Sequence, residues 1–179
     1  RQNLLFSATM PREIRRLADE VLHEPHVVDL AGSAPAETIE HALYPVPEAR
    51  KRDLLEHILA SSDCHSAIVF TRTKRGADRL TRHLQQDGIR ADAIHGDKTQ
   101  GARTRALADF KRGRTRVLVA TDIAARGLDI EDLPQVVNYE LPHVAEDYVH
   151  RVGRTARAGR QGRVRSPAHA RPRPEDHDR

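Results

Sequence analysis

The chain has 179 residues, with 30 Lys and Arg against 26 Asp and Glu, so its net charge is +4 at pH 7. This length allows one sizeable domain with appendages, and so small a charge does not by itself predict nucleic-acid binding. A single cysteine, Cys64, excludes an internal disulfide and a zinc site built on several cysteines. Because we find neither a long apolar run nor a signal-peptide pattern, we expect a cytoplasmic protein without membrane attachment.

The first 32 residues predict the last part of a preceding domain. A short strand is expected at residues 4–6, and an amphipathic helix at residues 11–22, where apolar residues recur every three or four positions. A further short strand is expected at residues 27–30. Residues 31–38 are small, polar and contain Pro and Gly, which is typical of a linker.

From Ile39 onward, strand patterns alternate with helix patterns. The expected strands are residues 39–46, 67–70, 91–94, 117–120 and 136–139, and the expected helices are residues 51–59, 75–86, 101–111 and 144–152. Short, wholly apolar strands separated by amphipathic helices predict βαβ units, a parallel sheet and helices on both of its faces. The predicted fold class is therefore α/β, with three α/β/α layers and a mostly parallel sheet, in a domain of residues 33–165.

The C-terminal residues 166–179 predict a disordered basic tail. They contain three prolines and almost no apolar side chains. Proline cannot donate a hydrogen bond to a neighbouring strand, and a polar segment cannot bury enough surface to order itself.

A basic stretch, residues 149–160 (VHRVGRTARAGR), follows the last expected strand. If the helix runs on through it, His150, Arg154 and Arg157 share one face, while Tyr148 faces inward. Gly153 offers the alternative that the helix ends there and leaves the arginines in a loop. Such a positive edge suits a polyphosphate or a nucleic-acid backbone, but an ordinary solvated face has the same composition.

Three expected strands end in polar residues that are compatible with phosphate binding. They are followed by Thr71-Arg72-Thr73-Lys74, by His95-Gly96-Asp97 and by Thr121-Asp122. Ligands of parallel α/β sheets bind beyond the carboxyl ends of the strands, so a shared binding edge is predicted here. Aromatic residues are only 3% of the chain, which favours contacts to a nucleic-acid backbone over base stacking.

Five segments in order resemble the motifs of the C-terminal RecA-like domain of DEAD-box ATP-dependent RNA helicases, and they resemble those of bacterial members most. These segments are SAT at residues 7–9, AIVFTRTK at 67–74, HGDKTQGAR at 95–103, ATDIAARGLDI at 120–130 and HRVGRTAR at 150–157. The resemblance covers nearly the whole chain. It implies a helicase that uses ATP to separate short RNA duplexes or to remodel RNA–protein complexes.

The resemblance implies that one set of residues contacts the phosphates and sugars of single-stranded RNA: Thr71, Arg72, Gly96, Gln100, Arg103 and Thr121. Gly96 lets a backbone approach closely. Gln100 and Arg103 lie three positions apart, so both can reach one run of phosphates.

The resemblance assigns a second set of residues to ATP and to the first RecA-like domain. Gly127 and Asp129 would hold the ATP ribose, and Arg154 and Arg157 would be arginine fingers that stabilise the transferring phosphoryl group. His150, together with Ser7 and Thr9, would couple the two domains. For Arg151 a structural role is the alternative to a role at the site, and Asp122 is expected to order its own loop.

The chain contains no phosphate loop and no Asp-Glu-Ala-Asp motif. We therefore expect a first domain to hold ATP and Mg²⁺, and we expect no metal site in this chain. The expected partners are RNA and that domain, and the expected state is a monomer. Two alternatives remain: half of a DNA-acting helicase or translocase, and a non-catalytic RNA-binding module.

The 179-residue chain alone is expected to show no measurable ATP turnover and only weak RNA binding. With about four phosphate contacts, the logarithm of the binding constant should fall with the logarithm of salt with a slope near −3. A coupled ATPase assay and an RNA titration at several salt concentrations measure both. RNA-stimulated turnover by the isolated chain would contradict this expectation.

Overall fold

The computed structural model describes residues 2–7, 10–28, 39–125, 130, 133–155 and 162–169. The chain divides into two compact units, Arg1–Ala34 and Pro35–Arg179, each of which is described by itself. In the described ranges, no helix is long and apolar enough to cross a membrane. The predicted boundary between the domains at residues 32 and 33 lies outside the described residues.

The first unit contains one helix, α1 (Arg12–Val21), as predicted. The strand expected at residues 4–6 is wrong, and residues 27 and 28 do not form the second expected strand either. A strand needs a neighbour for its backbone N–H and C=O groups, and the described part of this unit contains no other strand to provide one. Leu4 and Phe6 are accordingly exposed, by 70% and 89%.

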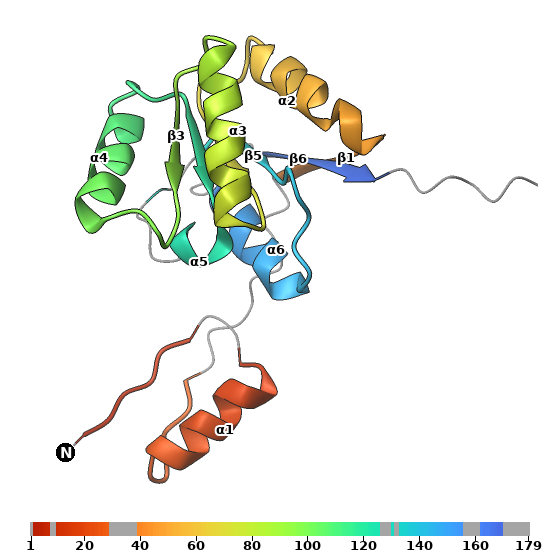
Figure 1. Cartoon of the computed structure of the whole chain (residues 1–179). Coiled ribbons are helices and arrows are strands. Elements are labelled where there is room, and N and C mark those ends of the chain that lie inside the picture. The colour runs from red at the N-terminus through yellow and green to blue at the C-terminus, as the bar shows by residue number, and fades with distance from the viewer. Residues whose placement is uncertain are drawn as a thin grey trace, which may run out of the picture. The chain divides into compact units, whose positions relative to one another are not determined.

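The second unit is a six-stranded sheet in the order β1-β6-β5-β2-β4-β3 (Figure 1). Every strand pair in the described part of this sheet is parallel. The strands are β1 (Ile39–Val46), β2 (Ala67–Phe70), β3 (Ala91–Ile94), β4 (Val117–Ala120), β5 (Gln135–Val137) and β6 (Gly162–His169). The helices are α2 (Lys51–Ala60), α3 (Lys74–Gln86), α4 (Gln100–Lys111), α5 (Asp122–Ala125) and α6 (Ala145–Val152), with a 3-10 turn at Glu48–Arg50.

Two hydrophobic cores cover the two faces of this sheet. One contains Leu55 and Leu59 of α2 and Leu84 of α3, packed with alternate strand residues such as Val69 and Val117. The other contains Phe110 of α4 and Val152 of α6, packed with Ile68 and Leu118. Because successive strand residues point to opposite faces, both cores draw on the same apolar strands. The predicted α/β/α layers and parallel sheet are confirmed.

Local signals define the ends of α3 and α4. Thr73 and Thr99 precede α3 and α4, and each side chain accepts a hydrogen bond from a backbone N–H of the first turn. Gly88 and Gly113 follow the same two helices with φ angles of 77° and 70°, a conformation that glycine adopts without strain. The short loops that follow bring the chain back to the sheet, which places the carboxyl ends of the strands along one edge.

The predicted disordered tail is wrong for residues 166–169, which belong to β6. This strand pairs with all eight residues of β1 and with β5, and Val164 and Ser166 are 0% and 4% exposed. Pro167 is tolerated because of its position. The backbone groups of Arg163 and Arg165 make hydrogen bonds on the β5 side of the strand. Alternate residues of a strand direct their backbone groups to the same side, so the nitrogen of Pro167 also faces that side, where β5 has already ended. Residues 170–179 lie outside the described residues.

Ser166→Asp distinguishes a core strand from a disordered tail. Ser166 is buried and accepts a hydrogen bond from Asn138 Nδ2 at 3.0 Å, so a carboxylate there is expected to lower the free energy of unfolding by about 3 kcal/mol. Urea denaturation followed by circular dichroism measures the change. Thr104→Asp, on the exposed surface of α4, is the control and should change stability by less than about 0.5 kcal/mol. Equal effects of the two substitutions would exclude a buried strand at residue 166.

Candidate functional site

The polar residues that follow β2, β3 and β4 lie next to one another, as the parallel sheet requires. The N–H of Thr71 donates to Ala120 O at 3.0 Å, and the N–H of Thr121 donates to Ile94 O at 3.3 Å. The N–H of Glu140, beyond β5, donates to Phe70 O at 3.2 Å. Four strand ends therefore form one continuous edge, which we call the carboxyl-end rim.

Thr71 and Thr121, both predicted to contact RNA, have little exposed side chain. They are 1% and 7% exposed, and the hydroxyl of Thr71 donates to Thr73 O at 3.3 Å. The structure thus places both residues on the rim, with their side chains turned into the protein.

Arg72 lies on the exposed side of the rim. Its N–H donates to Glu140 Oε2 at 2.7 Å, and its guanidinium lies 3.6 Å from Glu140 Oε1 and 3.3 Å from His143 Nε2. Its side chain is 46% exposed. Glu140 therefore orients Arg72 through both the backbone and the side chain while leaving the guanidinium accessible.

The loop after β3 is held by two acidic residues. Asp97 bonds to Lys74 Nζ at 2.5 Å, and this hydrogen bond holds the pKa of Asp97 below its ordinary value. Asp78 of α3 lies 2.8 Å from Lys98 Nζ and 3.0 Å from His95 Nε2. Burial would raise the pKa of Asp78, but its contacts with His95 and Lys98 outweigh burial and lower it.

Gly96 lies between these two anchors. A Cβ placed there would lie 3.5 Å from Lys74 Cε and 3.6 Å from Nζ, which are ordinary contacts. A Cβ at this position therefore meets no obstacle among the described residues. What the glycine leaves open is space at the rim for a molecule from outside.

Gln100 and Arg103 lie together on the first turn of α4, as their spacing predicts. Arg103 Nη1 donates to Gln100 Oε1 at 3.3 Å, and Arg103 Nε is buried without a hydrogen-bond partner among the described residues. A buried N–H donor without a partner costs free energy, and a bound anion at this turn would relieve that cost.

Arg151 of α6 is the largest fully buried side chain described, at 1% exposure. Its Nε and Nη2 bond to the two carboxylate oxygens of Asp122, at 2.5 and 2.8 Å. Its Nη1 donates to Asn138 Oδ1 at 3.0 Å and to Glu140 O at 2.6 Å, and its guanidinium lies 4.8 Å from the centre of the Phe70 ring. The suspected structural role of Arg151 is thereby supported.

Sequence reasoning did not identify the partners of Arg151, although one signal was available. Arg151 lies three positions after Tyr148 and beside Val152, on the side of the helix that faces the core. A buried guanidinium requires a carboxylate as its partner. Asp122, two residues after the end of β4, is a carboxylate next to a buried strand. Asp122 was expected to order its own loop, and it also binds α6 to that loop.

His150 and Arg154 lie at the end of α6. The helix ends at Val152, and the N–H of Gly153 bonds to Val149 O at 2.9 Å. Of the two possibilities that the sequence offered, the structure shows the helix ending before Gly153, so Arg154 does not continue the helical face of His150, and Arg157 lies outside the described residues. A small depression there is lined by Phe70, Asp122, Ala125, Asp147, His150, Arg151 and Arg154.

Thr155 fixes the turn that carries Arg154. It is 2% exposed, its hydroxyl donates to Leu133 O, and the N–H of Leu133 donates to Arg154 O at 3.1 Å. Thr9, Gly127, Asp129 and Arg157 lie outside the described residues. Ser7 is exposed in the first unit. The described residues contain no group of three or more His, Cys, Asp or Glu side chains arranged to hold a metal ion.

A comparison with protein families matches residues 50–159 to the helicase conserved C-terminal domain. The chain is 46% identical over 165 residues to DEAD-box ATP-dependent RNA helicase 30 of Arabidopsis thaliana and 48% identical over 163 residues to ATP-dependent RNA helicase CshA of Listeria monocytogenes. Each match covers 90% of this chain but only 28% and 31% of those proteins.

A solved structure has the same fold. Dbp5 of S. cerevisiae, bound to RNA and ADP BeF3, matches 93% of this chain and 44% of its own with a TM-score of 0.81 and 33% identity. The fold and the matched segments define a RecA-like helicase domain. The chain belongs to the helicase conserved C-terminal domain family and represents the C-terminal domain of DEAD-box RNA helicases.

Arg151→Met is expected to lower the free energy of unfolding by about 3 kcal/mol or more, because Asp122 would keep a partly buried carboxylate without its cation. Thermal and urea denaturation measure the loss. Arg75→Met, which removes an exposed arginine from α3, is the matched control and should have little effect. If both variants unfold alike, Arg151 does not connect α5 and α6.

Proposed function

We propose that this domain acts as the second half of an ATP-dependent RNA helicase, in which it binds RNA along the carboxyl-end rim and supplies arginine to the ATP site. The family supports the use of ATP and the class of substrate. The observation that carries the proposal is the paired Gln100 and Arg103 at the start of α4, with an unpartnered guanidinium N–H, next to the open space at Gly96.

On the RNA side, we assign phosphate and sugar contacts to the rim. Arg72, Gln100 and Arg103 contribute side chains, and Gly96 lets the RNA backbone come close. Thr71 and Thr121 belong to the same rim but are buried as whole residues, so the exposed side chains of the rim provide most of the proposed contact with RNA. Contacts of this kind position RNA without reading its sequence.

On the nucleotide side, we assign Arg154 and Arg157 to charge stabilisation and Gly127 and Asp129 to the ribose of ATP. ATP, when bound, supplies the phosphoryl transfer, and Mg²⁺ would be held by a phosphate-loop domain. Arg154 suits its role because Thr155 anchors its turn at Leu133 while its own side chain stays partly exposed. His150, Ser7 and Thr9 would contact the phosphate-loop domain and couple its closure to RNA binding.

Arg154→Ala is expected to reduce ATP turnover by a factor of about 10³ or more while RNA affinity stays within about twofold. The measurement uses a chimera in which this chain follows the first domain of the L. monocytogenes protein, because that relative is 48% identical over this region. Arg112→Ala, an exposed arginine that follows α4, is the control. Near-normal turnover by the Arg154 variant would reject the assignment.

Arg103→Ala is expected to weaken binding to all RNA sequences and to flatten the salt slope by about 0.7, since one phosphate contact on a single strand is lost. Titration of the same chimera with oligo(U) at 50 to 300 mM KCl, with an ATP analogue present, measures the slope. Arg105→Ala provides a control two positions away on α4, with its side chain in a groove outside the rim. A common slope for both variants would argue against an RNA contact at Arg103.

Two alternative functions predict different results with the same chimera. A DNA-acting motor predicts equal stimulation of ATP turnover by single-stranded DNA and RNA, whereas the proposed function predicts stimulation by RNA. A non-catalytic RNA-binding module predicts RNA binding with no stimulation by either polymer.

A further inference from the structure

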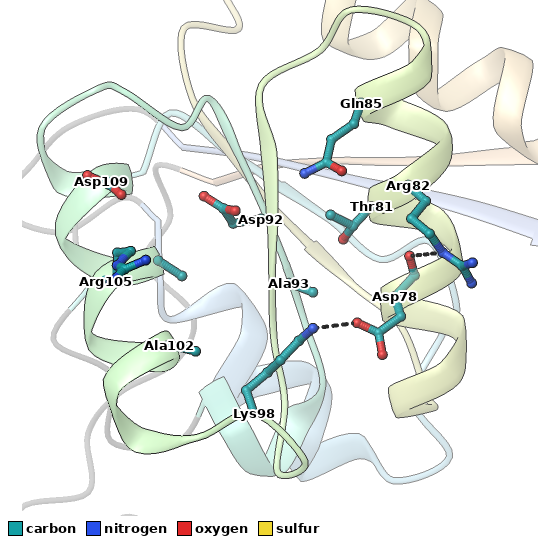
Figure 2. A pocket seen from close by; sticks show the side chains of 11 residues that line it. Asp78, Thr81, Arg82, Gln85, Asp92, Ala93, Lys98, Ala102, Arg105 and Asp109 are labelled. Atoms are coloured by element: carbon teal, nitrogen blue, oxygen red, sulfur yellow. Dashed lines mark hydrogen bonds and ion pairs between the residues drawn. The ribbon is translucent and has the colours of Figure 1, made fainter.

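A groove of about 530 Å³ lies between α3 and α4, and none of the residues that we assign to RNA or ATP lines it (Figure 2). Its charged lining residues are three acids and three bases, so the groove favours neither an anion nor a cation: Asp78, Asp92, Asp109, Arg82, Lys98 and Arg105. A different set of polar side chains, between α6 and the sheet, is joined to Arg151 and therefore to the candidate site.

Two side chains of α6 attach this helix to the rest of the domain through hydrogen bonds. Arg151 binds Asp122 and Asn138. Tyr148 lies three positions earlier, on the same face of the helix. Its hydroxyl lies 2.8 Å from Nδ1 of His41, and its ring stacks on the imidazole with the ring centres 6.0 Å apart. Because His41 belongs to the edge strand β1, α6 is held both beyond β5 and at the edge of the sheet.

Buried polar side chains connect these two points of attachment. Arg151 Nη1 donates to Asn138 Oδ1 at 3.0 Å, and Asn138 Nδ2 donates to Ser166 Oγ at 3.0 Å. Ser166 is hydrogen-bonded in turn to the phenol of Tyr148. The residues Arg151, Asn138 and Ser166 are each 4% exposed or less, so water has little access to them. A chain of hydrogen bonds therefore runs from Arg151 to His41.

The guanidinium of Arg151 fixes the direction of this chain. A guanidinium only donates, so Asn138 presents its oxygen to Arg151 and its NH₂ group to Ser166. The Ser166 hydroxyl accepts from Asn138 and keeps its own proton for the oxygen of Tyr148. Burial raises the pKa of Tyr148 and the hydrogen bond with Ser166 lowers it, as a donor to the phenol oxygen does. The phenol proton is left for His41, whose Nδ1 has to accept it.

We infer that His41 is a positioning residue for the ATP side of the candidate site, because it provides the terminal acceptor of this chain. It does so as a neutral imidazole with its proton on Nε2. His41 thereby holds Tyr148 and, with it, the rotation of α6 about its own axis. His150 and Arg154 lie at the end of that helix, so their placement depends on an acceptor on the edge strand. This role rests on the proposed function, in which Arg154 stabilises the transferring phosphoryl group.

The first test reads the direction of the chain and needs neither RNA nor ATP. In the ¹⁵N-labelled 179-residue chain at about pH 8, where histidine is ordinarily neutral, long-range ¹H–¹⁵N correlations show which ring nitrogen carries the proton. The signal of His41 is the one that His41→Gln removes. We expect its proton on Nε2 alone, and Tyr148→Phe should give a mixture of both tautomers. A proton on Nδ1, or a mixture in the unaltered chain, would overturn the inference.

The second test uses the chimera with the first domain of the L. monocytogenes protein and two substitutions of His41. His41→Gln keeps an acceptor and removes the ring, whereas His41→Phe keeps a ring and removes the acceptor. We expect His41→Phe to lower RNA-stimulated ATP turnover about fivefold, the effect of one lost hydrogen bond, with RNA affinity within about twofold. His41→Gln should keep at least about half of the turnover on the same grounds.

Controls separate positioning from stability. His41 is exposed, so both of its variants should melt within about 2 °C of the unaltered chain. Leu43→Gln, at a 62% exposed position of the same strand, should leave turnover unchanged. If His41→Phe were to lose turnover only together with a lower melting temperature, His41 would be a stabilising residue and not a positioning one.

The remaining outcomes distinguish this inference from the proposed function. Normal turnover of His41→Phe with impaired turnover of His41→Gln would show that ring packing matters and the acceptor does not, which overturns the inference. If Arg154→Ala abolishes turnover while His41→Phe does not reduce it, the inference fails and the proposed function stands. If neither substitution affects turnover, both fail together.

Discussion

The guanidinium of Arg151 is the interaction on which the candidate site depends. It joins α6 to Asp122 of α5 and to Asn138 and Glu140 beyond β5. These are the segments next to Thr121 on one side and His150 and Arg154 on the other. Removing a guanidinium from water is costly, and only a nearly complete set of partners offsets that cost. Lysine, with a single nitrogen, could not bind all of these groups at once.

This arrangement connects two surfaces that have different roles in the proposed function. In that proposal, the carboxyl-end rim binds RNA and the end of α6 lies at the nucleotide. Arg151 joins α6 to the segments that follow β4 and β5, and Glu140 extends the same network to Arg72. A displacement of α6 would therefore be transmitted to the loop after β4 through short, directional hydrogen bonds. In the proposed function, coupling between ATP and RNA would use this connection within the domain.

Most of the second unit could be predicted from the sequence because local and long-range signals agree there. The strands AIVF and VLVA are apolar throughout since helices cover both of their faces, and Thr73, Gly88 and Gly113 mark helix ends through their own chemistry. The meeting of Gln100 with Arg103 followed from helical spacing alone. The shared edge of three loops followed from the parallel sheet.

The errors occurred where structure depends on a neighbour. Residues 4–6 have a strand composition but no strand partner among the described residues, whereas residues 166–169 have a poor composition but pair with residues 43–46 of β1, which holds them extended. Whether Pro167 disrupts a strand depends on the side to which its nitrogen points, and the sequence does not contain that information. The partners of Arg151 likewise come from segments 11 to 29 residues away.

The pairing of β1 with β6 also determines when this domain can be completed during synthesis. Ile39, the first residue of β1, lies opposite Gly162, and among the described strands only β6 pairs with β1. A nascent chain can assemble β2 to β5 early, but β1 must wait until residues 162–169 have emerged from the ribosome. Closing so long a loop is slow, and until then the backbone of β1 is available to other chains. The cell therefore handles an incomplete sheet for most of the time that this domain takes to be translated.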